Sequence, residues 1–389
     1  MNRKILFLII IIIALIILGL VLFFVIGKGD VSQTPIISRF FPASEEREAA
    51  SISEKEKEEE ERIIATGERK EEKLIQLSDK PVISAAFSSS TNKVRYLEKI
   101  NGHLYEIESN GKNKNRISNV TILNIFEVRW SKEADKTVLR FEKDGKIKNF
   151  AASFAGTSTE GAFLNDNLKS IAASPEENKI AYLEKTGERG AIFIADFNGQ
   201  NKKQIFSVPL SDWALFWQDK DNLSLLAPPS AFSKGFLYSL NIKNKNLEKL
   251  LEGNGLNVLW SKNGKDLLIS ENTGNTIQNK VILNNKEYGL SSKTLPEKCV
   301  WSAKESGIVF CAVPLNFPFA NYPDDWYQGK ISFKDVVFKI NYLTGENNII
   351  DGEISDLDFD AINLFLSSDE KYLFFINKKD SMIWSMKIK

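Results

Sequence analysis

Residues that could perform chemistry are few in this sequence. There is one histidine, His103, and there are two cysteines, Cys299 and Cys311. A zinc site of three histidines or four cysteines therefore cannot form within one chain, and any Ser-His-Asp triad would have to use His103. His103 lies in NGHLYEIE, beside a predicted turn, where we expect a surface or turn residue. Gly-x-Ser-x-Gly elbows and phosphate-binding Gly-rich loops are absent from the sequence, so we predict no catalytic residue, no metal and no cofactor.

A segment rich in proline and aromatic residues is the main candidate for binding. It reads PLNFPFANYPDDWYQGKISFK, residues 314–334. The candidate binding residues are Phe317, Phe319, Tyr322, Asp324, Asp325, Trp326 and Tyr327. Aromatic side chains on an ordered loop can bind sugar, peptide or protein. The alternative is a loop that packs its own aromatics and plugs a channel, which we favour for Trp326 because ordered inserts commonly fold on themselves. Asp324 and Asp325 could ligate calcium, but adjacent carboxylates without the spacing of a calcium loop are weak evidence for such a site.

The two cysteines flank a predicted hairpin. Depending on the turn, Cys299 and Cys311 lie directly opposite one another or one residue out of register. Directly opposite residues are close enough to form a disulfide, which an extracytoplasmic location would permit. The alternative is two buried thiols that act as small hydrophobic residues.

The elements that carry these residues repeat along the chain. A strand ending in Trp or another apolar residue is followed by a polar turn and an alternating strand, and most units add a third and a fourth strand. The positions that end the first strands are Phe87, Trp130, Ala173, Trp217, Trp260, Trp301 and Leu366. They lie about 40–45 residues apart, except before Leu366, where residues 314–334 lengthen the sixth unit. This pattern predicts an all-β, seven-bladed β-propeller over residues 73–389.

The strand order within a blade predicts where the loops lie. Because antiparallel strands alternate in direction, loops between second and third strands lie at the same end of the ring as the connections between blades. The segment 314–334 and the loop at 227–235 are therefore expected at one end. The seventh unit, residues 359–389, holds only three strands, and its third is MIWSMKIK, residues 382–389. KLIQLSD, residues 73–79, is a strand without a unit, and we predict that it pairs with MIWSMKIK and closes the ring.

Two stretches carry a resemblance to a known family. IAASPEENKIAYLEKTGERGAIFIADFNGQNKKQI, residues 171–205, and WSKNGK, residues 260–265, resemble the WD40-like repeats of TolB-type β-propellers. The resemblance covers about residues 73–389 through a degenerate motif. The whole arrangement also resembles uncharacterised membrane-anchored bacterial propeller proteins, which implies a place in the cell envelope. TolB itself has an additional amino-terminal α/β domain for which this chain has no room, so its partner-binding role is not carried over intact.

The amino end predicts a membrane anchor. Residues 5–26, ILFLIIIIIALIILGLVLFFVI, carry no charge and as a helix would cross the hydrocarbon layer of about 30 Å. A cleaved signal peptide usually has a shorter apolar region and an Ala-x-Ala site, which is missing here. Arg3 and Lys4 precede the segment, whereas Lys28 after it is offset by Asp30. The positive-inside rule then makes residues 1–4 a cytoplasmic tip and the propeller extracytoplasmic, on a single-pass protein of the inner membrane.

Residues 27–72 read as a linker. The stretch Glu45 to Glu72 is dense in Glu with interspersed Lys and Arg, which predicts a solvated stalk that is either helical or disordered. The whole chain has 51 Lys and Arg against 51 Asp and Glu, so nothing in its net charge favours nucleic acid as a partner.

These features predict a membrane-anchored extracytoplasmic β-propeller that binds or scaffolds an envelope protein or peptide, with carbohydrate as another possible ligand. The alternative is a carbohydrate-active or other hydrolytic enzyme with its site at the channel mouth. Two carboxylates about 5–10 Å apart at that mouth would favour the enzyme.

Overall fold

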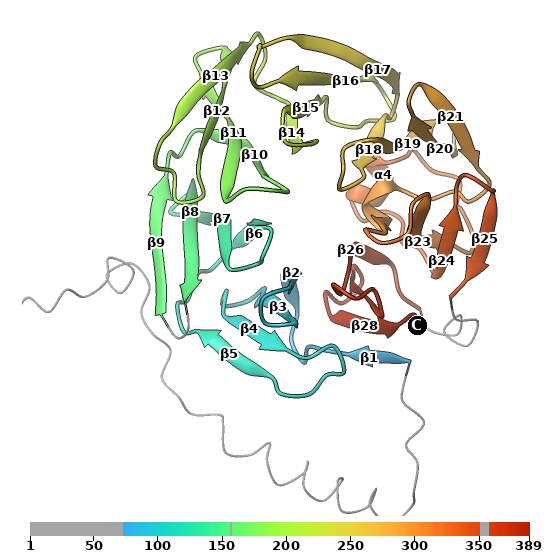
Figure 1. Ribbon diagram of the computed structural model, residues 1–389, viewed down its shortest axis with the longest axis horizontal. Helices are drawn as coiled ribbons and strands as arrows, with labels where there is room; N and C mark the ends of the chain where they lie inside the picture. Colours follow the sequence, from blue (N-terminus) through green and yellow to red (C-terminus); the bar gives the residue numbers. More distant parts are fainter. Residues whose placement is uncertain (1–72, 156–157, 351–357) are drawn as a thin grey trace, which may run out of the picture. The chain divides into compact units, whose positions relative to one another are not determined.

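The computed structural model of the protein describes residues 73–155, 158–350 and 358–389. These residues form seven four-stranded antiparallel sheets arranged as blades around a ring (Figure 1). The seven-bladed, all-β propeller predicted from the repeat is therefore confirmed. The predicted anchor at 5–26 and linker at 27–72 lie outside the described residues, and among the described helices none is long and apolar enough to cross a membrane.

Within each of the first six blades the strands run in sequence order from the centre of the ring outward (Figure 1). Blade 1 contains β2 (Val82–Ser88), β3 (Lys93–Glu98), β4 (Leu104–Ile107) and β5 (Asn115–Ser118), and blade 2 contains β6 (Ile125–Trp130), β7 (Lys136–Lys143), β8 (Lys146–Ala155) and β9 (Ser158–Leu164). Blade 3 contains β10 (Leu168–Ala173), β11 (Lys179–Thr186), β12 (Arg189–Asp196) and β13 (Lys203–Val208), and blade 4 contains β14 (Ala214–Trp217), β15 (Asn222–Leu226), β16 (Lys234–Asn241) and β17 (Leu247–Asn254). Blade 5 contains β18 (Asn257–Trp260), β19 (Asp266–Asn272), β20 (Ile277–Leu283) and β21 (Lys286–Leu290). Blade 6 follows the 3₁₀ helix η1 (Pro296–Lys298) and contains β22 (Cys299–Trp301), β23 (Ile308–Pro314), β24 (Asp335–Asn341) and β25 (Glu346–Ile349).

Blade 7 is built from both ends of the described chain. It contains β26 (Ala361–Leu366), β27 (Tyr372–Asn377) and β28 (Ile383–Lys387), and its outer strand is β1 (Leu74–Gln76). β1 pairs antiparallel with β28, with Ile75 opposite Ser385. This is the pairing that the sequence indicates between KLIQLSD and MIWSMKIK.

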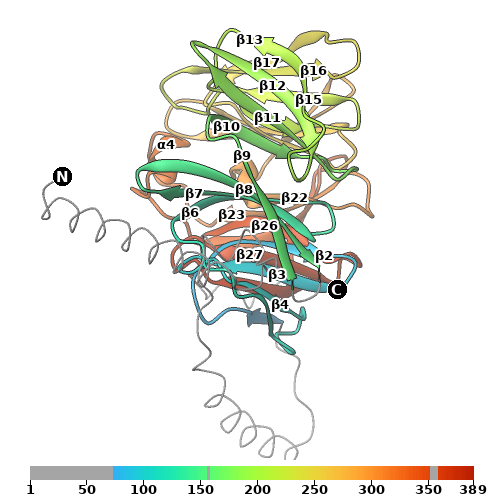
Figure 2. The same cartoon turned by 90° about the vertical axis from the view of Figure 1, so that its left-hand side faces the viewer.

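The ring has two different ends. We call the end with the second-to-third-strand loops and the blade connections the insert end, because it carries residues 315–334 between β23 and β24. We call the opposite end, with the short first-to-second and third-to-fourth-strand turns, the turn end. Lys73 lies at the turn end, where its carbonyl accepts a hydrogen bond from Lys387 N at 2.7 Å. Figure 2 shows the separation, with helix α4 (Asp324–Tyr327) of the insert on one side and the carboxyl terminus on the other.

The first turn of a blade is fixed by its own polar side chains. In blade 5, Ser261 Oγ donates to Asn263 Oδ1 at 2.7 Å and accepts from Asp266 N at 2.9 Å. Gly264 has φ of +68°, and a Cβ there would meet Gln218 O of blade 4 at 2.7 Å. Glycine therefore permits both the turn and the close approach to the neighbouring blade.

Tryptophans at the ends of first strands pack between blades, as their place in the repeat suggests. Trp130 Nε1 donates to Ser84 Oγ of blade 1 at 2.9 Å, and Trp301 Nε1 donates to Leu259 O of blade 5 at 3.2 Å. Trp217 packs against the apolar core shared by blades 3 and 4. The core of the propeller is thus a series of apolar layers between neighbouring blades.

The expectation that His103 lies at the surface is wrong, although the residue does follow a turn. Its side chain is buried, and Nε2 lies 3.1 Å from Thr121 Oγ1 of the following blade connection. Gly102 precedes it at φ of +72°, which turns the chain inward against Ile122. Burial lowers the pKa of His103 below its ordinary value, so the neutral ring is favoured.

Candidate binding face

The insert folds on itself. Tyr322, Trp326 and Phe333 are buried, and the ring of Phe317 lies 4.4 Å from that of Tyr322 between centroids. These side chains form a small apolar cluster with residues of the neighbouring blade connection and blade 5, among them Leu295 and Ile277. In Figure 1, α4 lies toward the inner side of the ring, between β18 and β26. The insert is therefore a packed structure with its own core, seated on the blades beside it.

Polar contacts tie the insert to two blades that precede it. Asp324 Oδ1 accepts from Ser230 Oγ at 3.1 Å, and Asp324 Oδ2 accepts from Ala231 N at 2.6 Å, both in the loop of blade 4 predicted at the same end. Asn272 Nδ2 of blade 5 donates to Tyr322 O at 3.1 Å. The insert is therefore fixed by hydrogen bonds to blades 4 and 5 as well as by its own apolar cluster.

Further contacts reach the chain on either side of blade 6. The Tyr327 hydroxyl accepts from Asn257 Nδ2 at 2.8 Å and bonds to Glu297. Trp326 Nε1 donates to Asp360 Oδ2, just before blade 7, at 2.9 Å. The insert thus connects blades 4, 5, 6 and 7 at one end of the ring.

The candidate binding residues fall into two groups. Tyr322 and Trp326 are almost fully buried and Phe317 is half-buried, so they are part of the insert's core. Phe319 is 85% exposed and Tyr327 is 43% exposed. Only these two aromatics are available to a partner without unfolding the insert.

The two carboxylates of the insert already have protein partners. Asp324 is bonded to the blade 4 loop, and Asp325 Oδ2 accepts from Asn321 N at 2.8 Å while Oδ1 pairs with Lys330 at 3.0 Å. The Asn321 amide and Lys330 lower the pKa of Asp325, which keeps it ionised. Among the described residues no group of three or more His, Cys, Asp or Glu is placed to hold a metal ion.

Exposed apolar side chains gather at the insert end. The large exposed ones are Ile100, Leu123, Phe126, Ile147, Phe163, Leu210, Phe232, Leu315, Phe319, Tyr327, Leu343 and Ile349. All of them except Leu343 lie in insert-end loops or in strand positions next to that end. Phe232, 74% exposed, lies in the blade 4 loop that binds Asp324. Large exposed apolar groups on one face are typical of an interaction surface.

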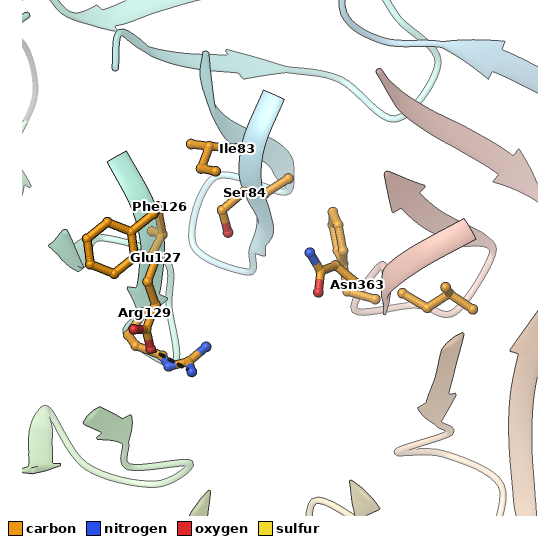
Figure 3. Close-up of a pocket in the computed structure, with 10 residues that line it drawn as sticks. Ile83, Ser84, Phe126, Glu127, Arg129 and Asn363 are labelled. Atoms are coloured by element: carbon orange, nitrogen blue, oxygen red, sulfur yellow. Dashed lines mark ion pairs between the residues drawn. The ribbon is translucent and has the colours of Figure 1, made fainter. Parts of the chain in front are cut away.

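A cavity of about 370 Å³ lies on the channel wall between β2, β6 and β26. Figure 3 shows Phe126, Arg129 and Asn363 around it, with Glu127 paired to Arg129. Glu127 Oε1 lies 2.7 Å from Arg129 Nη2, and its Oε2 lies 2.5 Å from Arg140 Nη1. Glu127 is the one carboxylate among the described residues lining this cavity, and two guanidinium groups hold it. The pair of carboxylates that would favour a glycosidase is not found on this wall.

A second cavity, of about 590 Å³, opens at the turn end between blades 3 and 4. Lys203, Lys220 and Lys245 line it together with Trp217 and several carboxylates. Its charges are mixed, and Lys243 pairs with Asp221 at 2.7 Å. This mixture does not point to one class of ligand.

The two cysteines lie directly opposite one another in the register of β22 and β23, and their sulfurs form a disulfide bond. Both residues are buried. The bond joins the first two strands of blade 6, immediately before the insert.

Sequence reasoning missed a buried ionic cluster. Lys298, Asp335 and Asp360 are fully buried where blades 6 and 7 meet the insert. Lys298 and Asp360 directly precede strands and Asp335 begins one, and a charged residue at such a position is usually solvated. Their meeting depends on the packing of two blades, and no local sequence signal marks it.

Comparisons with known proteins define the fold but not a family. No protein-family model matches the sequence, and no curated protein matches it. An oligogalacturonate lyase in complex with manganese matches with a TM-score of 0.59 at 10% identity, covering 81% of this chain and 93% of the lyase. An uncharacterized protein from Listeria monocytogenes matches with a TM-score of 0.54 at 16% identity, covering 80% of this chain and 96% of that protein.

TolB from Acinetobacter baumannii is also similar, with a TM-score of 0.42 at 10% identity over 79% of this chain and 63% of TolB. That score is too low to carry an argument. The similarities to the lyase and to the Listeria protein therefore show the propeller fold alone, and the seven blades are given by the sheets of this chain.

Proposed function

We propose that the chain is a membrane-anchored, extracytoplasmic binding module whose insert end holds a protein or peptide of the cell envelope. The observation that carries the proposal is the gathering of exposed apolar side chains at this end, with Phe319 and Phe232 the most exposed of them. Among the described residues of the turn end, Leu343 is the one large apolar residue that is exposed.

The insert supports the proposal because its exposed residues stand on a rigid base. Phe319 belongs to a loop whose neighbour Tyr322 is fully buried and whose Trp326 is bonded to Asp360. Residues presented by a preorganised loop lose little conformational entropy on binding. An exposed aromatic on such a base is typical of an interface hot spot.

The direction of the chain is a second support. Lys73 enters β1 at the turn end, so a linker and anchor preceding it would attach there. The insert end is the opposite end of the ring from this attachment. The membrane anchor at 5–26 and the extracytoplasmic orientation are part of this proposal and rest on the charges that flank the apolar segment.

An enzymatic function has less support. The lyase with a similar fold was solved with manganese, whereas the described residues of this chain offer no cluster of three metal-binding side chains. One carboxylate, that of Glu127, lines the channel cavity, and it forms ion pairs with Arg129 and Arg140. We therefore do not carry the lyase activity over to this chain.

The test compares two variants of the full-length chain in native membranes. Phe232→Ser with Phe319→Ser removes the two most exposed aromatics of the insert end, and Leu343→Ser is the matched control at the turn end. After crosslinking and affinity purification, a partner retained by the wild type and the control should fall about 30-fold or more in the double variant, as expected for a hot spot of about 2 kcal/mol. Equal recovery in all three would overturn the proposed face.

A further inference from the structure

The buried ionic cluster at the junction of blades 6 and 7 has an unusual composition. Lys298 Nζ lies 2.6 Å from Asp360 Oδ1 and 2.7 Å from Asp335 Oδ2, and all three side chains have no exposed surface. The ring centroids of Trp326 and Phe333 each lie 5.2 Å from the same nitrogen. One amine thus meets two carboxyl groups and the Ala361 carbonyl oxygen, at 3.0 Å, beside two aromatic rings.

The two oxygens of Asp360 have different environments. Oδ1 contacts the lysine nitrogen at 2.6 Å. Oδ2 accepts from Trp326 Nε1 at 2.9 Å, Phe333 N at 3.1 Å and Ser332 Oγ at 3.3 Å. Fixed donors on one oxygen stabilise negative charge that develops there when a nucleophile attacks the adjoining carbon. Asp360 therefore resembles an acyl group held in an oxyanion hole, with an amine beside its other oxygen.

Asp335 is placed to move a proton. Its Oδ2 contacts Lys298 Nζ and accepts from Ala361 N at 2.7 Å, while its buried Oδ1 has no hydrogen-bond partner among the described residues. Burial raises the pKa of Asp335 to about 6, an effect that Lys298 partly opposes. A carboxyl group with such a pKa can accept and return a proton near neutral pH.

We propose that Lys298 and Asp360 join in an intramolecular amide bond, with Asp335 transferring the proton. The neutral amine of Lys298 attacks Cγ of the protonated Asp360, and negative charge collects on Oδ2. Asp335 accepts a proton from Nζ and delivers it to Oδ1, which leaves as water when Oδ2 reforms the carbonyl. One C–N bond forms, one C–O bond breaks and one water is released, so no oxidant, reductant or co-substrate is required.

The bond would connect two consecutive blades. Lys298 ends η1 just before β22 of blade 6, and Asp360 directly precedes β26 of blade 7. Blade 7 is the blade completed by the three-residue strand β1. A covalent link at this junction would oppose opening of the ring from the blade 6 side.

The test is the mass of the full-length chain, purified from membranes in detergent and reduced so that the disulfide does not contribute. We expect the intact mass to be lower than the sequence mass by one water. Proteolysis should give a branched peptide in which the Lys298 side chain is joined to Asp360. Lys298→Arg keeps a positive charge but has no amine nucleophile, so it should show the full sequence mass. Lys378→Arg, which alters a second lysine beside the Trp326 ring, should still lose water.

Two results would overturn the proposal. One is a folded wild-type protein with the full sequence mass. The other is a loss of water confined to a linear peptide containing Asp360. That result would indicate that the Asp360 side chain has cyclised onto the backbone of its own peptide. Asp335→Asn tests the proton transfer separately, since it should abolish the branched peptide. A branched peptide formed by Asp335→Asn as completely as by the wild type would exclude that role.

Discussion

Substitution of Trp326 by alanine should destabilise the propeller strongly. The Trp326 side chain is 3% exposed and packs in the insert's core, with ring centroids 6.0 Å from Phe333 and 5.7 Å from Tyr327. Truncating a buried Trp in a well-packed site costs about 3–5 kcal/mol. The loss should spread beyond the insert, because the insert connects four blades.

The hydrogen bond of Trp326 adds to this cost. Its Nε1 donates to the buried Asp360 Oδ2 at 2.9 Å, and a buried acceptor that loses a donor costs about 1–3 kcal/mol. Asp360 Oδ2 keeps Phe333 N and Ser332 Oγ as donors, so the lower half of that range applies. We therefore expect Trp326→Ala to lower the free energy of unfolding by about 4–7 kcal/mol.

Two further variants separate the contributions. Trp326→Phe keeps most of the ring but removes the donor, so it should cost about 1–2 kcal/mol. Phe319→Ala, in the same loop but 85% exposed, should change stability by less than about 0.5 kcal/mol. Chemical denaturation of the three variants beside the wild type gives the comparison. A loss below about 1 kcal/mol for Trp326→Ala would refute the structural role of the insert, because only surface substitutions usually cost so little.

Four other expectations follow from the fold and the charges. Deletion of residues 73–79 removes β1 and exposes the edge of β28, so light scattering should detect aggregates; a monomer with an unchanged melting temperature would contradict this closure. Replacing Cys299 and Cys311 by serine should cost about 3 kcal/mol in denaturation, because the bond closes a loop with a sequence separation of 12; an unchanged midpoint would argue against the bond's contribution. Burial raises the pKa of Asp335 in the folded state to about 6 from its ordinary value of 3.8, so its contribution to stability should be lost as pH rises from about 4 to 6. Asp335→Asn should flatten the plot of unfolding free energy against pH over this range, and equal slopes for the variant and the wild type would assign the pH dependence to another group. Protease added to intact cells stripped of their outer layer should digest the propeller, and protection until lysis would reverse the predicted orientation.

The repeat could be predicted from sequence because each blade encodes its own turn. In WSKNGK, Ser261 and Asn263 supply the hydrogen bonds of the turn, and Gly264 supplies its positive φ. Such signals are local in the sequence, so they can be recognised without knowledge of the tertiary structure. The pairing of β1 with β28 could be predicted for a related reason, since one unit lacked a strand and one strand lacked a unit.

The division of the insert's aromatics could not be predicted in this way. Phe317 and Phe319 are two residues apart and of the same type, yet Phe317 packs against Tyr322 whereas Phe319 is exposed. The difference depends on where Leu295 and Ile277 lie beneath the insert. The prediction that His103 lies at the surface was wrong for the same reason, because the blade connection that carries Thr121 covers its side chain.

The stabilising features are unevenly placed around the ring, and the closing strand offers a physical reason. β1 contributes only Leu74, Ile75 and Gln76 to blade 7, so opening this edge breaks few hydrogen bonds. On the blade 1 side, the Ser385 hydroxyl donates to Ser109 O and the ring of Phe374 stacks on Phe87. On the blade 6 side lie the disulfide, the insert and the buried ionic cluster, all within about one blade of the closure. A short closing strand is sufficient when the blades on either side of it are held independently, because separation of β1 alone then does not release blade 7.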